Sequence, residues 1–595
     1  MVRKDIRHFA DGSAKTWVRV VEGYRPAPGK APKQRTIKSF GYLEDQDDPE
    51  AFMELVRSFD EEQRRDAPIQ IEVSSNVRMY GTENRKQNYG YKYLEAIYNR
   101  LEIDAYIRRY EKNSKFRGTY SLGNIFKFLV LYRILAPDSK RATCQISNQP
   151  YGFETNFTLK DVYRALDSFA DFSIDLQKHM NERVKRLVGR EMNYAFYDVT
   201  NYYFEIDEPD EDGLRRRGVS KEHRVDPIVQ MGLFLDEKGL PVSMSLFPGN
   251  TSETLTLQPM MQEIKRSYGL GRLVVVADKG LNSSTNIDKI INNGDGYVVS
   301  QILRGTKGKR YHEALFDTES YTISADGSYK YKLYNEEYIG RDAEGEPVRR
   351  KRQVLIYWSR AEAEMMKAKR KEKLQRAESA TRNPVYTIAK GKQAYTKEII
   401  IDATTGQELD DTARQVSVDY EKAEQDAAYD GYFCILTSEM DYSAQKIREV
   451  YGGLWKIEES FRVMKSDLDA RPVYVSTEKH IQAHFLICFT ALLVVRMLQY
   501  EMGGNAISSE RIARALNAAN CRMLRGGILQ LDDVGGALAF ESRTAKNGAQ
   551  EETLVYSGED EIAQDYRRIQ QVFGVDFDYV YPKQEVFSRF LSKLV

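Results

Sequence analysis

The chain has 595 residues, more than one hydrophobic core usually serves, so we expect several domains. Lys plus Arg and Asp plus Glu each total 88, so the formal net charge is zero. This balance speaks against a globally basic protein that coats nucleic acid, although local basic patches can still meet a phosphate backbone. With 42% hydrophobic residues, the composition also excludes a disordered tail protein.

Four scattered cysteines, none in a C-x-x-C pair, exclude a disulfide scaffold and a zinc ribbon and fit a reducing cytosol. The first residues contain no apolar stretch typical of a signal peptide. The longest apolar run, 485–495, has about half of the roughly 20 residues that a membrane span needs, and it predicts a buried helix. We therefore expect a soluble, cytoplasmic protein without a membrane partner.

The pattern of apolar residues changes several times along the chain. Residues 14–42 predict two strands around a Pro/Gly-rich turn, within a small β-containing arm at 1–80. Apolar residues three and four apart predict a helical domain over 81–190. From 191 to 302, five strand-like segments with a helix after the fourth predict a mixed α/β sheet.

A basic segment with β-like pieces, such as 397–409, interrupts this regularity at 303–445. From 301 to 400 it holds 22 Lys and Arg against 14 Asp and Glu, so it is basic within a neutral chain. Helical periodicity returns over 446–500, and the signals of 501–595 are weaker.

Two aspartates stand in or directly after strand-like segments. Asp198 lies inside the apolar run NYAFYDVTNYYFE, where a bare carboxylate costs several kcal/mol unless it is paired, hydrogen-bonded or metal-bound. Asp278 follows Val274–Ala277, at the carboxyl end of a buried strand, where open α/β sheets bind ligands. If these two strands are neighbours, the aspartates can share one Mg²⁺ or Mn²⁺. The alternative is that each aspartate caps a turn, which fits Asp278 better than Asp198.

A third carboxylate, Glu458, lies in YGGLWKIEESFRVMKSDLD. The apolar residues of this segment recur three and four apart and predict the buried stripe of one helix. An adjacent stripe holds Tyr451, Trp455, Glu458, Arg462 and Lys465. This arrangement can add a carboxylate to a metal site and place cations beside a phosphate. An ordinary amphipathic helix with a solvated charged face explains the same pattern.

Three segments, YDVTNYYFE, VVVADKGLNS and Y-x-x-L-W-x-I-E-x-x-F-R-x-x-K, resemble in this order the motifs of DDE transposases of bacterial insertion sequences. The last resembles the Y-R-E-K signature branch. The resemblance implies a ribonuclease-H-like α/β catalytic core over 191–302 and 446–500. It also implies a β-rich basic insertion domain at 303–445. Outside the match, we expect a helical DNA-binding domain at 81–190 and a helical C-terminal region at 501–595.

Residue by residue, the resemblance makes Asp198, Asp278 and Glu458 the catalytic residues and the ligands of two Mg²⁺ or Mn²⁺ ions. Tyr451 matches the signature tyrosine and Lys465 its lysine, both as DNA contacts. One ion activates water or a 3′-hydroxyl, and the second stabilises the leaving oxygen.

The signature arginine is absent, because Leu454 occupies its position. Leu454 falls in the apolar stripe and cannot bind a phosphate. Arg462 is the nearest basic residue that could compensate as a DNA contact. In the insertion, Trp358 could stack on a flipped DNA base, although a tryptophan at the end of a strand is more often part of a core.

The resemblance implies a transposase that binds the terminal inverted repeats of its element, cleaves the ends and joins them to target DNA. Its expected partners are double-stranded DNA and further copies of itself, as a homodimer or higher homo-oligomer in the bacterial cytoplasm, associated with the nucleoid. One alternative is a catalytically inactive, transposase-derived DNA-binding protein. Another is a phosphotransferase with Asp198 as nucleophile, which the absence of an acid at Thr200 disfavours.

Overall fold

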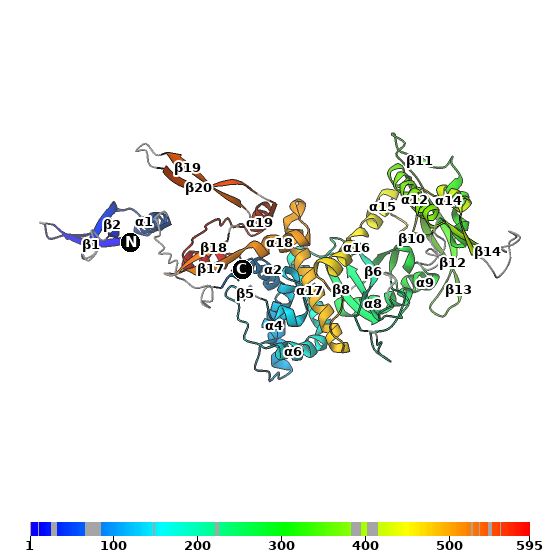
Figure 1. Ribbon diagram of the computed structural model, residues 1–595, viewed down its shortest axis with the longest axis horizontal. Helices are drawn as coiled ribbons and strands as arrows, with labels where there is room; N and C mark the ends of the chain where they lie inside the picture. Colours follow the sequence, from blue (N-terminus) through cyan, green and yellow to red (C-terminus); the bar gives the residue numbers. More distant parts are fainter. Residues whose placement is uncertain are drawn as a thin grey trace. The chain divides into compact units, whose positions relative to one another are not determined.

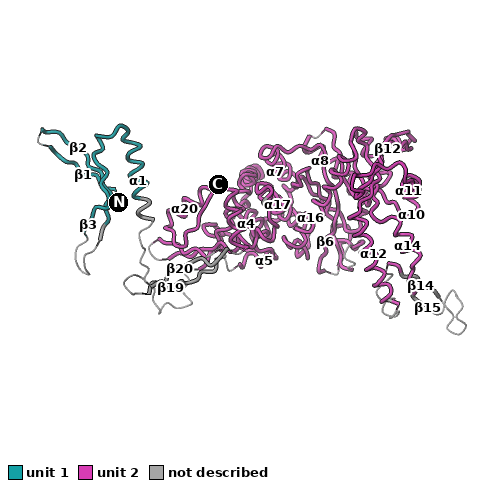
Figure 2. Tube along the Cα trace, turned by 90° about the horizontal axis from the view of Figure 1, so that it is seen from above, with its two compact units in different colours: residues 1–83 teal, residues 84–595 magenta. Residues whose placement is uncertain are grey.

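The computed structural model divides into two compact units, residues 1–83 and 84–595 (Figure 2). It describes residues 2–9, 11–24, 33–65, 85–146, 149–206, 208–220, 225–269, 271–381, 394–400, 414–524, 527–532, 534, 536–544, 550–559 and 561–594.

The first unit is a three-stranded antiparallel sheet with one long helix. Its strands are β1 (Val2–His8), β2 (Ala14–Tyr24) and β3 (Lys33–Tyr42), in the order β1-β2-β3, and its helix is α1 (Pro49–Arg65). Buried Val18 and Val20 of the sheet form a small core with Val56 of the helix. The two strands predicted within 14–42 are present, and the turn predicted between them lies at 25–32, outside the described residues.

The second unit begins with helices that pack against a buried helix from much later in the chain. These are α2 (Tyr91–Arg100), α3 (Ile103–Asn113), α4 (Leu122–Leu135), α5 (Lys140–Thr143), α6 (Leu159–Asp171) and α7 (Ser173–Val188). The later helix, α17 (Glu478–Met502), contacts α4 and α6 (Figure 1). By length and composition α17 could cross a membrane, but 89% of its most apolar window is buried inside the protein. It therefore has the burial of a core helix, as predicted for 485–495.

A nine-stranded sheet carries the rest of the core. Its central strands are β6 (Tyr194–Tyr203), β7 (Ile228–Leu235), β8 (Pro241–Pro248), β9 (Val274–Ala277) and β10 (Gly296–Gln301). They lie in the order β10-β9-β6-β7-β8. β6, β9 and β10 are parallel to one another, β7 is antiparallel to β6, and β8 is antiparallel to β7. Apolar residues of α8 (Glu253–Tyr268) and α9 (Ser284–Asn292) cover one face, and those of α15 (Ala444–Gly452), α16 (Trp455–Arg462) and α17 cover the other. The predicted mixed α/β sheet is present.

The segment 303–445 extends this sheet and also adds a separate two-stranded sheet. Strands β11 (Thr322–Ile323), β12 (Tyr329–Arg341), β13 (Pro347–Ser359) and β16 (Tyr432–Thr437) follow one another to the edge of β10. β16 pairs with both β13 and β10, which satisfies the backbone groups that an edge strand would leave open. The segment also contains α10 (Gly305–Gly308), α11 (His312–Phe316), α12 (Arg360–Thr381), α14 (Tyr420–Ala427) and the pair β14 (Thr396–Ile400) and β15 (Arg414–Val418). β14 covers the beginning of the strand predicted at 397–409, and residues 401–409 lie outside the described residues.

The C-terminal region contains strands as well as the predicted helices. Its helices are α18 (Ser509–Ala518), α19 (Glu561–Val572) and α20 (Gln584–Ser592). Strand β17 (Asn520–Leu524) pairs with β18 (Ile528–Leu531) and with β4 (Gln87–Asn88), which also pairs with β5 (Gln149–Pro150). Strand β19 (Gly536–Thr544) pairs with β20 (Gln550–Glu559). The prediction of a helical region missed these strands, whose segments give weaker signals in the sequence.

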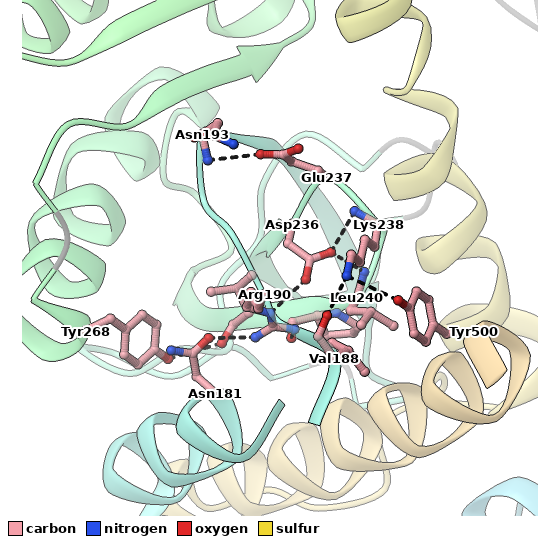
Figure 3. Close-up of polar contacts among 12 residues, drawn as sticks. Asn181, Val188, Arg190, Asn193, Asp236, Glu237, Lys238, Leu240, Tyr268 and Tyr500 are labelled. Atoms are coloured by element: carbon pink, nitrogen blue, oxygen red, sulfur yellow. Dashed lines mark hydrogen bonds and ion pairs between the residues drawn. The ribbon is translucent and has the colours of Figure 1, made fainter. Parts of the chain in front are cut away.

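A buried ion pair joins the helical region to the sheet (Figure 3). Arg190, just after α7, donates from Nε to Oδ2 of Asp236 at 2.7 Å, and both side chains are almost fully buried, at 2% and 1% exposure. The other guanidinium nitrogens donate to Oδ1 of Asn181 and to the carbonyl of Pro241. The Asp236 Oδ1 accepts the backbone N–H groups of Lys238 and Leu240. This network anchors the β7–β8 hairpin to α7.

Candidate active site

The register of two parallel strands brings Asp198 and Asp278 level. β6 and β9 are neighbours, with Phe196 opposite Val276, so continuing this register by two residues sets Asp198 opposite Asp278. Asp278 keeps an extended backbone, with φ −80° and ψ 171°. Side chains alternate between the faces of a sheet, so both carboxylates project on the face that carries Phe196 and Val276. Neighbouring strands lie about 4.8 Å apart, so the two carboxylates can reach one ligand.

Two hydroxyl groups hold the Asp278 carboxylate. Ser300, on β10, donates to Oδ1 at 2.8 Å, and Tyr451, on α15, donates to the same oxygen at 3.3 Å. Burial raises the pKa of Tyr451, and the nearby Asp278 charge adds to the shift, so the phenol remains a donor at neutral pH. No described residue donates to Oδ2 or forms an ion pair with Asp278. Asp278 therefore has a fixed orientation and one oxygen open to a ligand.

The helical segment that carries Glu458 crosses the same face of the sheet. The Lys456 Nζ lies 5.5 Å from the centre of the Phe196 ring, and the Tyr202 hydroxyl contacts the Met464 sulfur at 3.7 Å. Phe196 and Tyr202 flank Asp198 on one face of β6, so the turn that carries Glu458 lies above that stretch of β6 (Figure 1). Glu458 is exposed, and no other described residue makes a hydrogen bond or ion pair with it.

The helix predicted for 451–469 is interrupted twice, so its polar stripe does not exist as one row. α15 ends at Gly452, and α16 starts at Trp455. A Cβ at Gly453 would lie 2.4 Å from the Phe196 ring, so this close approach requires glycine. Farther on, residues Val463–Asp467 form a π-helical turn. Tyr451 consequently points at Asp278, whereas Trp455 is 60% exposed.

Lys465 lies in this π-helical turn, a distortion that is frequent at functional sites. Its Nζ lies 5.6 Å from the centre of the Tyr202 ring, which is on the same face of β6 as Asp198. The predicted signature lysine is therefore on the side of the sheet that carries the acids.

Arg462 has a different environment. It binds Glu459 with two nitrogens at 2.8 Å and Asp467 at 3.0 Å on the exposed side of α16, and the Glu459 carboxylate raises its pKa. Leu454 is buried in the core, as its place in the apolar stripe predicted. Arg462 thus already has two acidic partners, and its role as a DNA contact stays a prediction.

Trp358 lies near the end of β13, in register with Tyr432. Its indole Nε1 donates to the carbonyl of Asp430 at 3.0 Å. Strand alternation places it on the face of Ile356, opposite the face that carries Asp198 and Asp278. The structure therefore does not bring Trp358 together with the acids, and stacking on a base stays a prediction.

The three acids offer only oxygen donors, which suit Mg²⁺ or Mn²⁺. Within the described part of the chain, no group of three or more His, Cys, Asp or Glu residues is close enough to hold a metal ion. Asp198 and Asp278 fit a shared cation by their register, whereas Glu458 is on the correct side but is not gathered with them.

Ser300 is a site residue that the sequence reasoning missed. Its signal is present in the sequence, since GYVVSQ is a buried strand that turns polar at its carboxyl end, as VVVAD does. Ser300 follows Val299, which pairs with Ala277, so it lies beside Asp278.

Two family models match parts of the chain. Residues 210–494 match the transposase DDE domain, and residues 2–69 match the N-terminal domain of IS1634 family transposases. The chain is a DDE transposase of an insertion sequence. Asp278 and Glu458 lie inside the matched DDE domain, and Asp198 lies just before it.

Among solved structures, the transposase resembles the Mos1 transposase paired-end complex with left transposon end. The two are 11% identical over 42% of this chain and 68% of that chain, with a TM-score of 0.14. A score this low carries no argument about the fold. No curated protein matches the transposase.

Proposed function

We propose that this transposase cleaves the ends of its element and joins them to target DNA, with Asp198, Asp278 and Glu458 binding two divalent cations. One observation carries the proposal: Asp198 and Asp278 lie opposite each other on neighbouring strands and on the same face of the sheet. The α16 turn that bears Glu458 crosses this face. Terminal inverted repeats and target DNA are the proposed substrates, and the active form is a homodimer or higher homo-oligomer on DNA in the cytoplasm.

The order of the central strands supports a ribonuclease-H-like core. The first core strand, β6, lies in the middle of the sheet, and the fourth, β9, is its parallel neighbour. A core of this type needs that adjacency, because its first acid stands on strand one and its second after strand four. The third acid then comes from a later helix, as Glu458 does.

The side chains of the site have different roles in phosphodiester transfer. When bound, the cations supply an activated water or 3′-hydroxyl and stabilise the leaving oxygen. Ser300 and Tyr451 fix Asp278 through Oδ1 and leave its second oxygen for coordination. Lys465 lies on the same face, where its charge can position the DNA backbone.

A second candidate function is DNA binding without catalysis, in a transposase-derived protein. The observation that favours it is that Glu458 is not gathered with the two aspartates among the described residues.

The decisive experiment incubates the full-length protein with Mg²⁺ and labelled DNA that carries the element's ends. We expect Asp198→Asn, Asp278→Asn and Glu458→Gln each to lower the cleavage rate by about a thousandfold or more, as for other essential active-site groups, with DNA affinity preserved. The matched control is Glu459→Gln, one residue along α16, whose carboxylate binds Arg462 instead; it should cut at nearly the wild-type rate.

Normal cleavage by Glu458→Gln would show that the third acid is assigned wrongly. Wild-type protein that binds the ends but never cuts them would favour the second candidate function.

A further inference from the structure

A cleft of about 640 Å³ opens beside Asp278, at the carboxyl edge of β10. Asp278, Lys279 and Tyr451 line it on the side of the proposed active site. Its other walls come from the start of β16 and from α12, a 22-residue helix of the 303–445 segment. The cleft therefore joins the candidate active site to the basic segment that separates Asp278 from Glu458 in the sequence.

One face of α12 lines this cleft. Its lining residues are Glu362, Met365, Met366, Lys369, Arg370 and Lys373, which recur at helical spacing. Lys369 and Lys373 are one turn apart, about 6 Å along the helix axis. Lys367 and Lys371 lie on the same helix but do not line the cleft, although all four lysines are exposed.

The cleft is basic, with five basic and three acidic side chains in its lining. Two of the cations have acidic partners, since Arg370 pairs with Asp430 and Arg304 pairs with Asp426. Lys279, Lys369 and Lys373 form no ion pair with any described residue. In the cleft beside Asp278, these three lysines are therefore available to bind an anion.

Aromatic side chains line the same cleft as these lysines. Tyr429, Tyr432 and Phe433 contribute to its walls, and all three are partly exposed. The Phe433 ring stacks on Tyr357 at 5.1 Å with an interplanar angle of 14°, so its support is rigid. Lysines and aromatic rings in one cleft suit an unpaired nucleic-acid strand, whose phosphates can contact the charges and whose bases can stack on the rings.

We infer that this cleft binds a single DNA strand that leads to or from the Asp278 site, with Lys369 and Lys373 on its phosphates. The inference rests on the proposed function, because that function makes DNA the substrate. Lys369 and Lys373 are DNA-binding residues outside the motifs of the catalytic core. A strand with one phosphate per roughly 3.4 Å of rise passes both lysines within about two nucleotides.

The test measures binding of the full-length protein to a fluorescent oligothymidylate and to a blunt duplex, in EDTA, over a series of salt concentrations. For the single strand, the double variant Lys369→Gln/Lys373→Gln should reduce the slope of log affinity against log salt by about 1.4, or about 0.7 per lost phosphate contact. Near 0.1 M salt its affinity should fall on the order of tenfold. Glutamine has nearly the helix propensity of lysine, so α12 should persist, which circular dichroism checks.

The matched control is Lys367→Gln/Lys371→Gln, with the same charge change on the same helix away from the cleft. It should leave the slope and the affinity unchanged. An unchanged slope in the cleft variant, an equal loss in the control, or a loss for the duplex as large as that for the single strand would each overturn the inference. The assay needs neither metal nor cleavage, so a failure of the catalytic proposal would leave its outcome readable.

Discussion

Two aspartates that follow strands of the same sheet have contrasting environments. Asp236 follows β7 and Asp278 follows β9, and these two strands run in opposite directions. Asp236 is buried and bonded to the Arg190 guanidinium and to two backbone N–H groups. Asp278 is partly exposed, and its two donors share one oxygen.

Asp236 therefore stabilises the fold, whereas Asp278 is available to bind a ligand. The oxygens of Asp236 are committed to internal donors, so the residue has no capacity for a ligand. Asp278 keeps an oxygen without a donor and forms no ion pair among the described residues. An oriented carboxylate of this kind costs free energy that a bound cation can offset.

Replacing a carboxylate with an amide should lower the free energy of unfolding most at Asp236. Asp236→Asn leaves Arg190 charged and buried without its partner, which costs about 3–5 kcal/mol. We expect a large shift of the urea unfolding midpoint, followed by circular dichroism. Asp278→Asn should leave that midpoint nearly unchanged.

Asp212→Asn is the control for Asp236→Asn, since the Asp212 side chain is fully exposed in its pair with Arg216. Its effect should stay within about 0.5 kcal/mol. A midpoint shift for Asp278→Asn that equals the one for Asp236→Asn would remove the distinction between the two acids.

A smaller effect is expected when one donor to Asp278 is removed. Ser300→Ala deletes the 2.8 Å hydrogen bond to Oδ1, and bonds to charged groups contribute roughly 1.5–3 kcal/mol. We expect about a tenfold slower cleavage rate with unchanged DNA affinity, measured in single-turnover assays. Ser300→Thr, which keeps the hydroxyl, should recover most of the rate. Equal rates for Ser300→Ala and wild type would show that Asp278 needs no orientation from β10.

The smallest effect should come from Tyr451→Phe, because its hydrogen bond to Asp278 is longer, at 3.3 Å. We expect about a threefold slower cleavage rate, below the range for strong charged hydrogen bonds. Burial raises the pKa of Tyr451, so its hydroxyl stays protonated and donating through the alkaline range. The ratio of wild-type to variant rates should therefore be constant from about pH 7 to pH 10. A ratio that approaches one near pH 10 would mean that the phenol ionises there.

The strands and the positions of the two aspartates could be predicted because their signals are local. Within five positions, the run VVVAD predicts a buried strand and the polar residue at its end. Only the pairing of the first and fourth strands had to be assumed, and β6 and β9 are indeed parallel neighbours.

What the sequence did not reveal depends on distant contacts. The break between α15 and α16 follows from the packing of Gly453 on Phe196, more than 250 residues earlier. Likewise, β16 joins the sheet beside β10 after more than 100 intervening residues, so periodicity alone could not show that 303–445 extends the core sheet. Ser300 was missed because the polar end of its strand indicates a site only once β10 is known to lie beside β9.

The late return of β16 and α16 also sets the order in which the site forms during synthesis. About 180 residues separate Asp278 from Glu458, which a ribosome adds in roughly 10–40 s. During that interval the nascent chain has both aspartates but neither Tyr451 nor the third acid, and β10 lacks its neighbour β16. The proposed site therefore gains its third acid only after the whole 303–445 segment has been made.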